Sequence, residues 1–432
     1  MTDGGADAPH ARIAPPAFLA SGAPAAILVT LPGARAVGGC VRDALAGRAV
    51  HDVDIAAPLP PEEIARRLLA AGLKVFGTGL AHGTVTAVLD RQPVEVTALR
   101  RDVATDGRHA EVAWTTDWRA DAARRDFRIN AMSLSADGRL WDYFGGREDL
   151  AAGRVRFVGD PATRLAEDYL RALRFFRFWA RYGRGEPDAA ALAAIRGAVP
   201  ALAARIAPER IWMELKRLLE APDPAPALEL MRASGLLAAV LPEAGGFAPL
   251  RLLVARGAPA DPLLRLGALL LGAEDAAVHG LVARLRLSGA ERGTLVQIVT
   301  MSELPTPPPI EEEGALRRFL AIRAGVPPED VRRQVWLAEA RDGQDRSRQR
   351  AAMDTTPWPV FPLKGRDLIA LGVPPGPAVG RLLGDLHAWW IAQGAAAPHA
   401  ACLAELRRRL ENPGAPPGAT DGTAAPGTPA GT

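Results

Sequence analysis

Two short motifs, Gly38-Gly39-Cys40-Val41-Arg42-Asp43 and Asp52-Val53-Asp54, are the most informative part of this sequence. The paired glycines follow a mostly apolar run and let the backbone turn sharply, so that its N–H groups face an anion at the start of a helix. If Asp52 and Asp54 share a strand, both carboxylates leave the same face, about 7 Å apart. Two such groups bind Mg²⁺ together with substrate phosphates. The motifs therefore predict a metal-dependent nucleotide site with Asp52 and Asp54 as its catalytic metal ligands.

Each motif alone is common, because paired glycines usually mark a turn and Asp-x-Asp is frequent in exposed loops. Their order and spacing, with Asp52 nine residues after Asp43, resemble the signature of the class II tRNA nucleotidyltransferases, which are the CCA-adding enzymes and bacterial poly(A) polymerases. The resemblance covers about residues 25 to 395 and is most specific between Gly38 and Arg177. It implies an α/β nucleotidyltransferase head with a polymerase beta-like mixed sheet, followed by an all-α neck, body and tail.

Length and composition exclude several classes of protein. A chain of 432 residues is long enough for two to four domains, and 48% apolar with 23% charged residues is typical of a soluble globular protein. The longest apolar stretch, Leu263 to Ala273, contains an arginine and is too short to span a bilayer, so we expect no membrane anchor. The first twelve residues lack the cationic start of a secretory signal. Two distant cysteines, Cys40 and Cys402, predict neither a disulfide framework nor a zinc site, which fits a reducing cytoplasm.

The chain divides into segments of different composition. Residues 1–24 are rich in Ala, Pro and Gly and are expected to be disordered. Residues 25–155 mix strand-like and helical patterns and form the predicted catalytic head, whereas strand signals nearly vanish after residue 160. We expect a helical neck and RNA-binding region over 156–245, which contains a base-reading helix over 162–182. A helical body and tail that binds tRNA is expected over 246–411, and a disordered tail over 412–432.

Two further features belong to the predicted head. Glu95 lies among apolar residues in a predicted strand, and a carboxylate is costly to bury there unless it is paired or bound to a cation. Glu95 is therefore a candidate third metal ligand, with an exposed strand position as the alternative. The polar run over residues 99–118 predicts a long loop, and in the resembled family a mobile loop at this place closes over the active site.

The segment from Arg164 to Trp179 predicts an amphipathic helix with arginines and carboxylates on its polar face. In isolation such a face is usually a solvated set of ion pairs. In the resembled family a helix reading Glu-Asp-x-x-Arg-x-x-Arg follows the catalytic sheet and pairs with the base edge of CTP or ATP. The resemblance assigns base reading to Glu167, Asp168 and Arg171, and phosphate contacts to Arg174 and Arg177 on this helix and to Gly39, Arg42 and Arg125 in the head.

The resemblance implies a template-independent RNA nucleotidyltransferase that adds or repairs the 3′-terminal CCA of tRNA. Its partners are tRNA, CTP and ATP, with no obligate protein partner, and it releases pyrophosphate by phosphoryl transfer with two Mg²⁺ ions. A poly(A) polymerase, or a partial enzyme that adds only CC or only A, is the nearest alternative. A non-catalytic RNA-binding protein is disfavoured by the intact Asp52, Asp54 and Arg42, and a phosphohydrolase by the lack of an HD-type His/Asp cluster.

Overall fold

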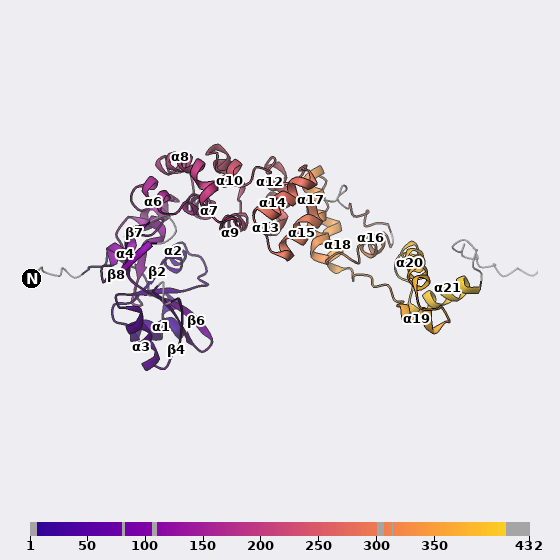
Figure 1. Ribbon diagram of the computed structural model, residues 1–432, viewed down its shortest axis with the longest axis horizontal. Helices are drawn as coiled ribbons and strands as arrows, with labels where there is room; N and C mark the ends of the chain where they lie inside the picture. Colours follow the sequence, from indigo (N-terminus) through magenta and orange to yellow (C-terminus); the bar gives the residue numbers. More distant parts are fainter. Residues whose placement is uncertain (1–6, 80–82, 106–109, 300–305, 313, 412–432) are drawn as a thin grey trace, which may run out of the picture. The chain divides into compact units, whose positions relative to one another are not determined.

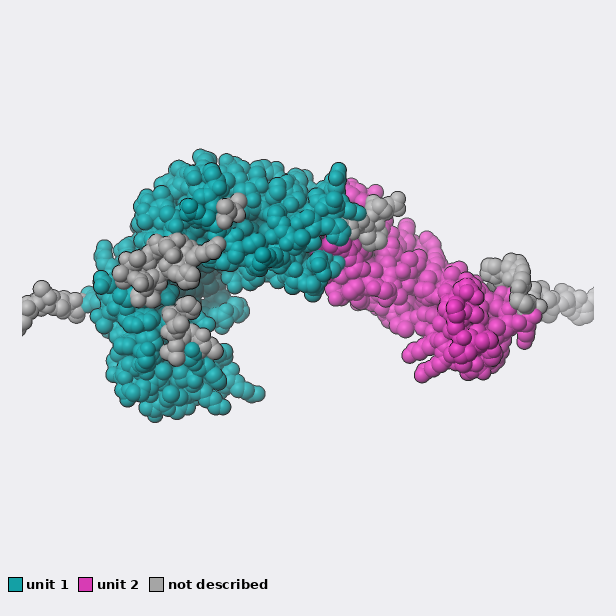
Figure 2. All heavy atoms as spheres, viewed as in Figure 1, with its two compact units in different colours: residues 1–293 teal, residues 294–432 magenta. Residues whose placement is uncertain are grey.

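Figure 1 shows the computed structural model of the chain, which describes residues 7–79, 83–105, 110–299, 306–312 and 314–411. The chain forms two compact units, residues 1–293 and residues 294–432 (Figure 2). The division expected near residue 245, between neck and body, therefore does not separate the two units. The expected tail over 412–432 lies outside the described residues.

The head contains a mixed sheet of eight strands in the order β1-β10-β9-β2-β3-β6-β5-β4. The bounds of these strands are β1 Ala11–Arg12, β2 Arg35–Val37, β3 Asp54–Ala57, β4 Lys74–Gly79, β5 Thr84–Leu89, β6 Gln92–Ala98, β9 Met132–Leu134 and β10 Arg139–Asp142. β3 and β6 run parallel, and every other neighbouring pair is antiparallel. The prediction of a mixed sheet in the head is confirmed.

The fold begins earlier in the chain than the composition suggests. Residues 1–24 were expected to be disordered, but Ala11 and Arg12 form β1 and pair with β10. The 3-10 helix η1 (Ala17–Leu19) follows, and its Leu19 side chain is fully buried. The prediction is thus wrong for these residues, because the edge strand, the buried leucine and the bonds of Asp7 to Arg35 and Tyr143, each at 2.7 Å, hold an Ala- and Pro-rich segment against the sheet.

A separate pair of antiparallel strands, β7 (Arg100–Thr105) and β8 (Ala110–Trp114), follows the main sheet. The long loop predicted over residues 99–118 is wrong at these strands, and residues 106–109 lie outside the described residues. The prediction was wrong because it took polarity as a sign of a loop. Antiparallel strands can have one face in water, so polar side chains do not exclude a strand.

The core of the head explains which face of the sheet carries the candidate site. In β6, Val94, Val96 and Ala98 are buried, while Glu95 between them is exposed. The buried face packs under α1 (Gly22–Thr30) and α3 (Pro61–Ala70), as Figure 1 shows. Because side chains alternate across a strand, Glu95 lies on the face that these two helices leave uncovered.

The remaining elements of the chain are helical. In the head they are α2 Gly39–Leu45, α4 Trp118–Ala123, η3 Arg128–Asn130 and α5 Gly146–Ala152. The rest of the first unit contains α6 Pro161–Glu167, α7 Leu170–Tyr182, α8 Ala189–Arg205, α9 Pro208–Leu219, α10 Ala225–Ala233, α11 Leu236–Val240, α12 Ala248–Ala255, α13 Pro262–Leu269, α14 Asp275–Arg284 and α15 Gly289–Val299, whose last residues belong to the second unit. The second unit continues with α16 Ala315–Ile322, α17 Pro328–Asp342, α18 Ser347–Thr355, α19 Gly365–Ala370, α20 Pro377–Ala392 and α21 His399–Glu411. Within the described residues no helix is both long and apolar enough to cross a membrane.

The single helix predicted over residues 162–182 is two helices. α6 ends at Glu167, and Asp168 takes an extended backbone conformation before α7 begins at Leu170. The backbone N–H of Leu170 donates to the Asp168 carboxylate at 3.0 Å. An aspartate side chain competes with the helical backbone for such local hydrogen bonds. The hydrophobic periodicity continues through Asp168, so it does not indicate this break.

Aromatic packing holds α7 against the head. Phe127, which follows α4, packs on Phe157 and on Phe178 of α7, with ring centroids 4.8 Å and 5.3 Å apart. Phe175 of α7 stacks on Phe157 at 6.1 Å. These buried rings fix the polar face of α7 relative to the glycine turn and to β3.

An ion-pair network joins α9 to the start of α15 and gives a testable pH dependence. Burial alone would raise the pKa of Glu291, but bonds from Lys216 at 2.8 Å, Ser288 at 2.9 Å and Trp212 at 3.1 Å lower it from 4.5 to about 2. We expect Glu291→Gln to lower the free energy of unfolding at pH 7 by about 1 kcal/mol, allowing for solvent screening.

The sign of this effect follows from the lowered pKa. The stabilisation by Glu291 is complete above pH 4.5 and is lost as the pH falls toward 2. Urea unfolding of both proteins between pH 7 and pH 3 should therefore show a difference that shrinks with acidification. A difference that stays constant with pH would contradict this assignment.

Candidate active site

The glycine turn places α2 beside β3. Gly38 has φ 73°, which is strained for any residue with a side chain. A Cβ at Gly38 would also lie 3.2 Å from Nη1 of Arg125, so the glycine leaves room for this guanidinium. Cys40, in the first turn of α2, is buried, and burial raises the pKa of its thiol to about 11. Cys40 is therefore a packing residue and not a nucleophile.

The predicted metal carboxylates are only partly brought together. Asp54 is the first residue of β3 and pairs with Glu95 in the parallel register of β3 and β6, so both side chains leave the same exposed face. Asp52 precedes the strand, and the strand geometry expected for Asp52 and Asp54 is therefore wrong. No group of three or more His, Cys, Asp or Glu side chains among the described residues is arranged to hold a metal ion.

Negative charge is nevertheless concentrated at Asp54. Its pKa is raised, first by partial burial and then by the neighbouring carboxylates of Glu95 and Asp52, while Arg125 acts in the opposite direction. Carboxylates that repel one another in this way are suited to a cation that neutralises them.

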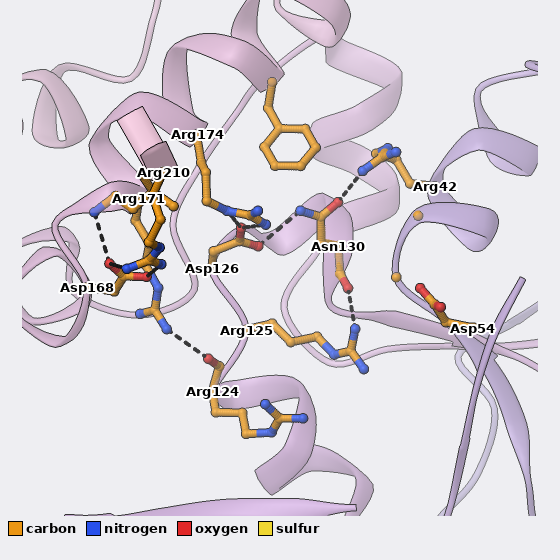
Figure 3. Close-up of a pocket in the computed structure, with 14 residues that line it drawn as sticks. Arg42, Asp54, Arg124, Arg125, Asp126, Asn130, Asp168, Arg171, Arg174 and Arg210 are labelled. Carbon is orange, nitrogen blue, oxygen red and sulfur yellow. Dashed lines mark hydrogen bonds and ion pairs between the residues drawn. The ribbon is translucent and has the colours of Figure 1, made fainter. Parts of the chain in front are cut away.

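A pocket of about 410 Å³ opens between the head and the helices α7 and α9 (Figure 3). Its lining residues are Gly38, Gly39, Arg42, Asp54, Arg124, Arg125, Asp126, Asn130, Asp168, Leu170, Arg171, Arg174, Phe178 and Arg210. Six of these are arginines and three are aspartates, so the pocket carries a net positive charge with Asp54 at one side. This charge suits an anionic ligand such as a triphosphate.

One continuous chain of hydrogen bonds crosses the pocket from α2 to α7, as Figure 3 shows. Arg42 donates to the side-chain oxygen of Asn130 at 2.7 Å, and the Asn130 amide donates to Asp126 at 3.0 Å. Arg174 of α7 donates to the other carboxylate oxygen of Asp126 through Nε at 2.8 Å and Nη2 at 2.5 Å. Two arginines from different parts of the chain are thereby held at fixed positions.

Asp126 is the centre of this network. Burial would raise its pKa, but Arg174, Asn130 and the backbone N–H of Phe127 together hold the pKa below its ordinary value. The carboxylate is therefore ionised at neutral pH, and it orients Arg174 and Asn130. Asp121 plays the same part for Arg124 and Arg125, which it contacts at 2.8 Å and 3.2 Å.

The break between α6 and α7 places base-reading candidates at the pocket wall. Asp168 forms an ion pair with Arg210 of α9 at 2.8 Å, and both side chains line the pocket. Arg171 lines it too and donates to the backbone oxygens of Arg164 at 3.1 Å and of Arg124 at 3.4 Å. Glu167 does not line the pocket, and its carboxylate instead binds Arg164 and Arg171.

Most of the site residues expected from the sequence line this one pocket. They are Gly39, Arg42, Asp54, Arg125, Asp168, Arg171 and Arg174. Asp52, Glu95, Glu167 and Arg177 lie outside its lining. Arg177 faces Glu214 at 2.7 Å and packs on Phe178, and burial lowers its pKa to about 10.

The predicted site lacked several of the residues that line the pocket, among them Arg124, Asp126, Asn130 and Arg210. Arg124, Asp126 and Asn130 lie within five residues of Arg125 in the sequence, close enough for the sequence to have indicated them. Arg210 lies 42 residues after its partner Asp168, and no local pattern connects the two.

Comparisons with known proteins show which family the chain is similar to. Residues 34–156 match the family described as the poly A polymerase head domain, and residues 186–245 match a probable RNA- and SrmB-binding site of polymerase A. A protein of Danio rerio named CCA tRNA nucleotidyltransferase 1, mitochondrial, is 37% identical over 364 residues, which cover 82% of this chain and 83% of the relative. The chain belongs to the CCA-adding tRNA nucleotidyltransferase family.

Other members of the CCA-adding family are also similar over two thirds or more of the chain. The mouse protein of the same name is 36% identical over 370 residues, covering 83% of each chain. A CCA-adding enzyme of Bacillus velezensis is 32% identical over 302 residues, covering 67% of this chain and 73% of its own.

Solved structures extend the likeness to the fold. The crystal structure of the Bacillus stearothermophilus CCA-adding enzyme in complex with CTP matches with a TM-score of 0.70 and 28% identity, covering 88% of this chain and 94% of that chain. The Thermotoga maritima CCA-adding enzyme complexed with tRNA has a TM-score of 0.58 at 19% identity, covering 87% and 91%, and it supports the fold alone. The chain is a nucleotidyltransferase, and enzymes of this kind use a divalent metal ion.

Proposed function

We propose that this nucleotidyltransferase completes or repairs the 3′-terminal CCA of tRNA, using CTP and ATP. The observation that carries the proposal is the pocket in which Asp54, the Arg42-Asn130-Asp126-Arg174 network and the Asp168–Arg210 pair meet. Relatives named for CCA addition, and a related enzyme solved with CTP, support the same chemistry.

Each group of residues has a proposed task in this reaction. Arg42, Arg125 and Arg174 carry the positive charge that holds a triphosphate, and Gly39 lets it approach the backbone. Asp168 and Arg171 offer an acceptor and a donor to the base edge. Glu167, which binds Arg171, is a positioning residue for it. Arg177 supports this wall through Glu214 and not through a ligand contact.

The proposed metal ion is Mg²⁺, with Asp54 as the main ligand and Asp52 and Glu95 as further candidates. Partial burial, and then repulsion from Glu95 and Asp52, raise the pKa of Asp54, and this crowding of hard carboxylate oxygens supports the assignment. A bound Mg²⁺ supplies charge stabilisation at the phosphates and activation of the attacking hydroxyl. The protein side chains orient the triphosphate and the base relative to that position.

A poly(A) polymerase of the same family is the second candidate, favoured by the match of residues 34–156 to a poly A polymerase head domain. Three tRNA transcripts, ending before CCA, after C and after CC, separate the candidates when each is incubated with CTP, ATP or both and sized to one nucleotide. We expect addition that stops after a complete CCA on every transcript. A long tail with ATP alone would instead establish poly(A) polymerase activity, and no incorporation would overturn both.

The cytoplasm is the proposed compartment, because both cysteines are buried as free thiols. The zebrafish, mouse and human relatives are named as mitochondrial proteins. Fractionation of cells that express the chain, followed by immunoblotting, tests the proposal, and recovery in an organelle fraction would contradict it.

A further inference from the structure

A second basic pocket lies outside the candidate active site, where the end of α2, α5 and the end of α7 meet. Its volume is about 500 Å³, within the range of small-molecule sites. Four arginines line it, Arg48, Arg147, Arg181 and Arg184, and no acidic side chain does. Leu45, Leu150 and Ala151 form part of its apolar wall. The active-site pocket differs, because its six arginines are accompanied by three aspartates.

Within the described residues, the guanidinium groups of these four arginines form no ion pair with a carboxylate, and only the backbone N–H of Arg147 donates to one, that of Asp142 at 2.8 Å. The nearby acidic residues of α5 do not compensate them, because Glu148 and Asp149 pair with Arg154 at 2.6 Å and 2.9 Å. Like charges gathered in this way repel one another, and a concave surface focuses their potential. The pocket therefore carries a concentrated positive charge that a bound anion would neutralise.

Two of these guanidinium groups are held in place by backbone carbonyls. Arg48 donates to the carbonyl oxygen of Arg181 at 2.7 Å, and Arg184 donates to that of Ala151 at 2.6 Å. Arg48 also packs over the Tyr182 ring, 4.7 Å from its centroid. A carbonyl contact occupies only part of a guanidinium, which has five N–H donors in a fixed planar fork. The remaining donors match the oxygens of a phosphate group.

We propose that this pocket, which we call the α2–α5 pocket, binds phosphate groups. The proposal goes beyond the proposed function, since it assigns a second anion site whose lining shares no residue with the active-site pocket. Phosphate groups reach such a pocket either on the RNA backbone or on a small molecule such as ATP or pyrophosphate. The chemistry of recognition is the same for both sources.

Charge reversal at one arginine tests the pocket. Arg147 is exposed and lines the pocket, so we expect Arg147→Glu to weaken phosphate binding without unfolding the chain. The matched control is Arg91→Glu in the turn between β5 and β6, which makes the same charge change at an exposed arginine outside both pockets and outside the region that matches an RNA-binding site. Arg181→Glu serves as a second pocket variant, and thermal unfolding by circular dichroism checks that all three remain folded.

The titrations identify the source of the phosphate. Binding is measured by fluorescence anisotropy with a tRNA transcript that lacks CCA, and by calorimetry with ATP and with pyrophosphate. If the source is RNA, the pocket variants raise the Kd for tRNA on the order of tenfold relative to Arg91→Glu. If it is a small molecule, the wild-type chain binds a second equivalent of ATP or pyrophosphate, which the pocket variants lose.

The proposal is overturned if both pocket variants match Arg91→Glu in all three titrations. These measurements follow binding and not nucleotide transfer. If the chain adds no CCA but binds phosphate at the α2–α5 pocket, the proposed function fails and the pocket proposal stands. Failure of the proposed function and failure of the pocket proposal are therefore distinguishable.

Discussion

Asp54→Ala is expected to reduce nucleotide transfer on the order of 10³-fold, equivalent to about 4 kcal/mol of transition-state stabilisation. Asp54 is the one carboxylate of the proposed metal set that lines the pocket, and its loss removes the main anchor for a cation there. The matched control is Asp385→Ala on α20, which removes an exposed carboxylate from the second unit. We expect that variant to keep full activity.

The same substitution should not destabilise the chain. The pKa of Asp54 is raised, so the folded surroundings disfavour its charged form and its removal relieves repulsion from Glu95 and Asp52. Loss of transfer together with an unchanged or higher melting temperature is the signature of a functional residue. Substantial turnover by Asp54→Ala, or inactivity caused by unfolding, would contradict this role.

Asp126→Ala is expected to have the largest effect on stability, about 3–5 kcal/mol of unfolding free energy. Asp126 is buried and binds Arg174 and Asn130, so its removal leaves Arg174 without its nearest charge partner inside the protein. Asp137→Ala is the control, because Asp137 pairs with Arg12 and Arg139 at the surface. An exposed pair of this kind contributes at most about 1 kcal/mol.

Kinetics should separate the structural and the functional part of this effect. Asp126→Asn keeps the shape of the side chain but removes its charge, and we expect it to fold while raising the KM for CTP because Arg174 is no longer held toward the pocket. Urea unfolding and steady-state kinetics on all three variants check these results. If Asp126→Ala and Asp137→Ala had the same free energy of unfolding, the network around Asp126 would not be a stabilising centre.

The fold was predictable where one face of an element is buried. The alternation of Val94, Glu95 and Val96 shows both the strand β6 and the exposed position of Glu95. The break at Asp168 was not predictable in the same way, since the hydrophobic period continues through it while one side chain competes for the backbone. The strands β7 and β8 were missed because their polarity is also typical of loops.

The candidate site was predictable to the extent that its residues stand in local motifs. Arg42, Arg125 and Asp54 lie within or beside such motifs, and they share one pocket. Arg210 lines the pocket and Glu167 does not, and both positions depend on contacts between α6, α7 and α9. A local sequence pattern does not encode such contacts. The arginines of the α2–α5 pocket come from three separate segments and carry no common signature in the sequence.

Protein side chains, and not a nucleic-acid template, are proposed to select CTP and then ATP for the 3′ end of tRNA. The most direct test is to incubate a tRNA transcript that lacks CCA with equal concentrations of all four nucleoside triphosphates and to sequence the 3′ ends. We predict that the added sequence is CCA and that addition then stops. Runs of A, or incorporation of G or U at rates similar to C and A, would contradict the account.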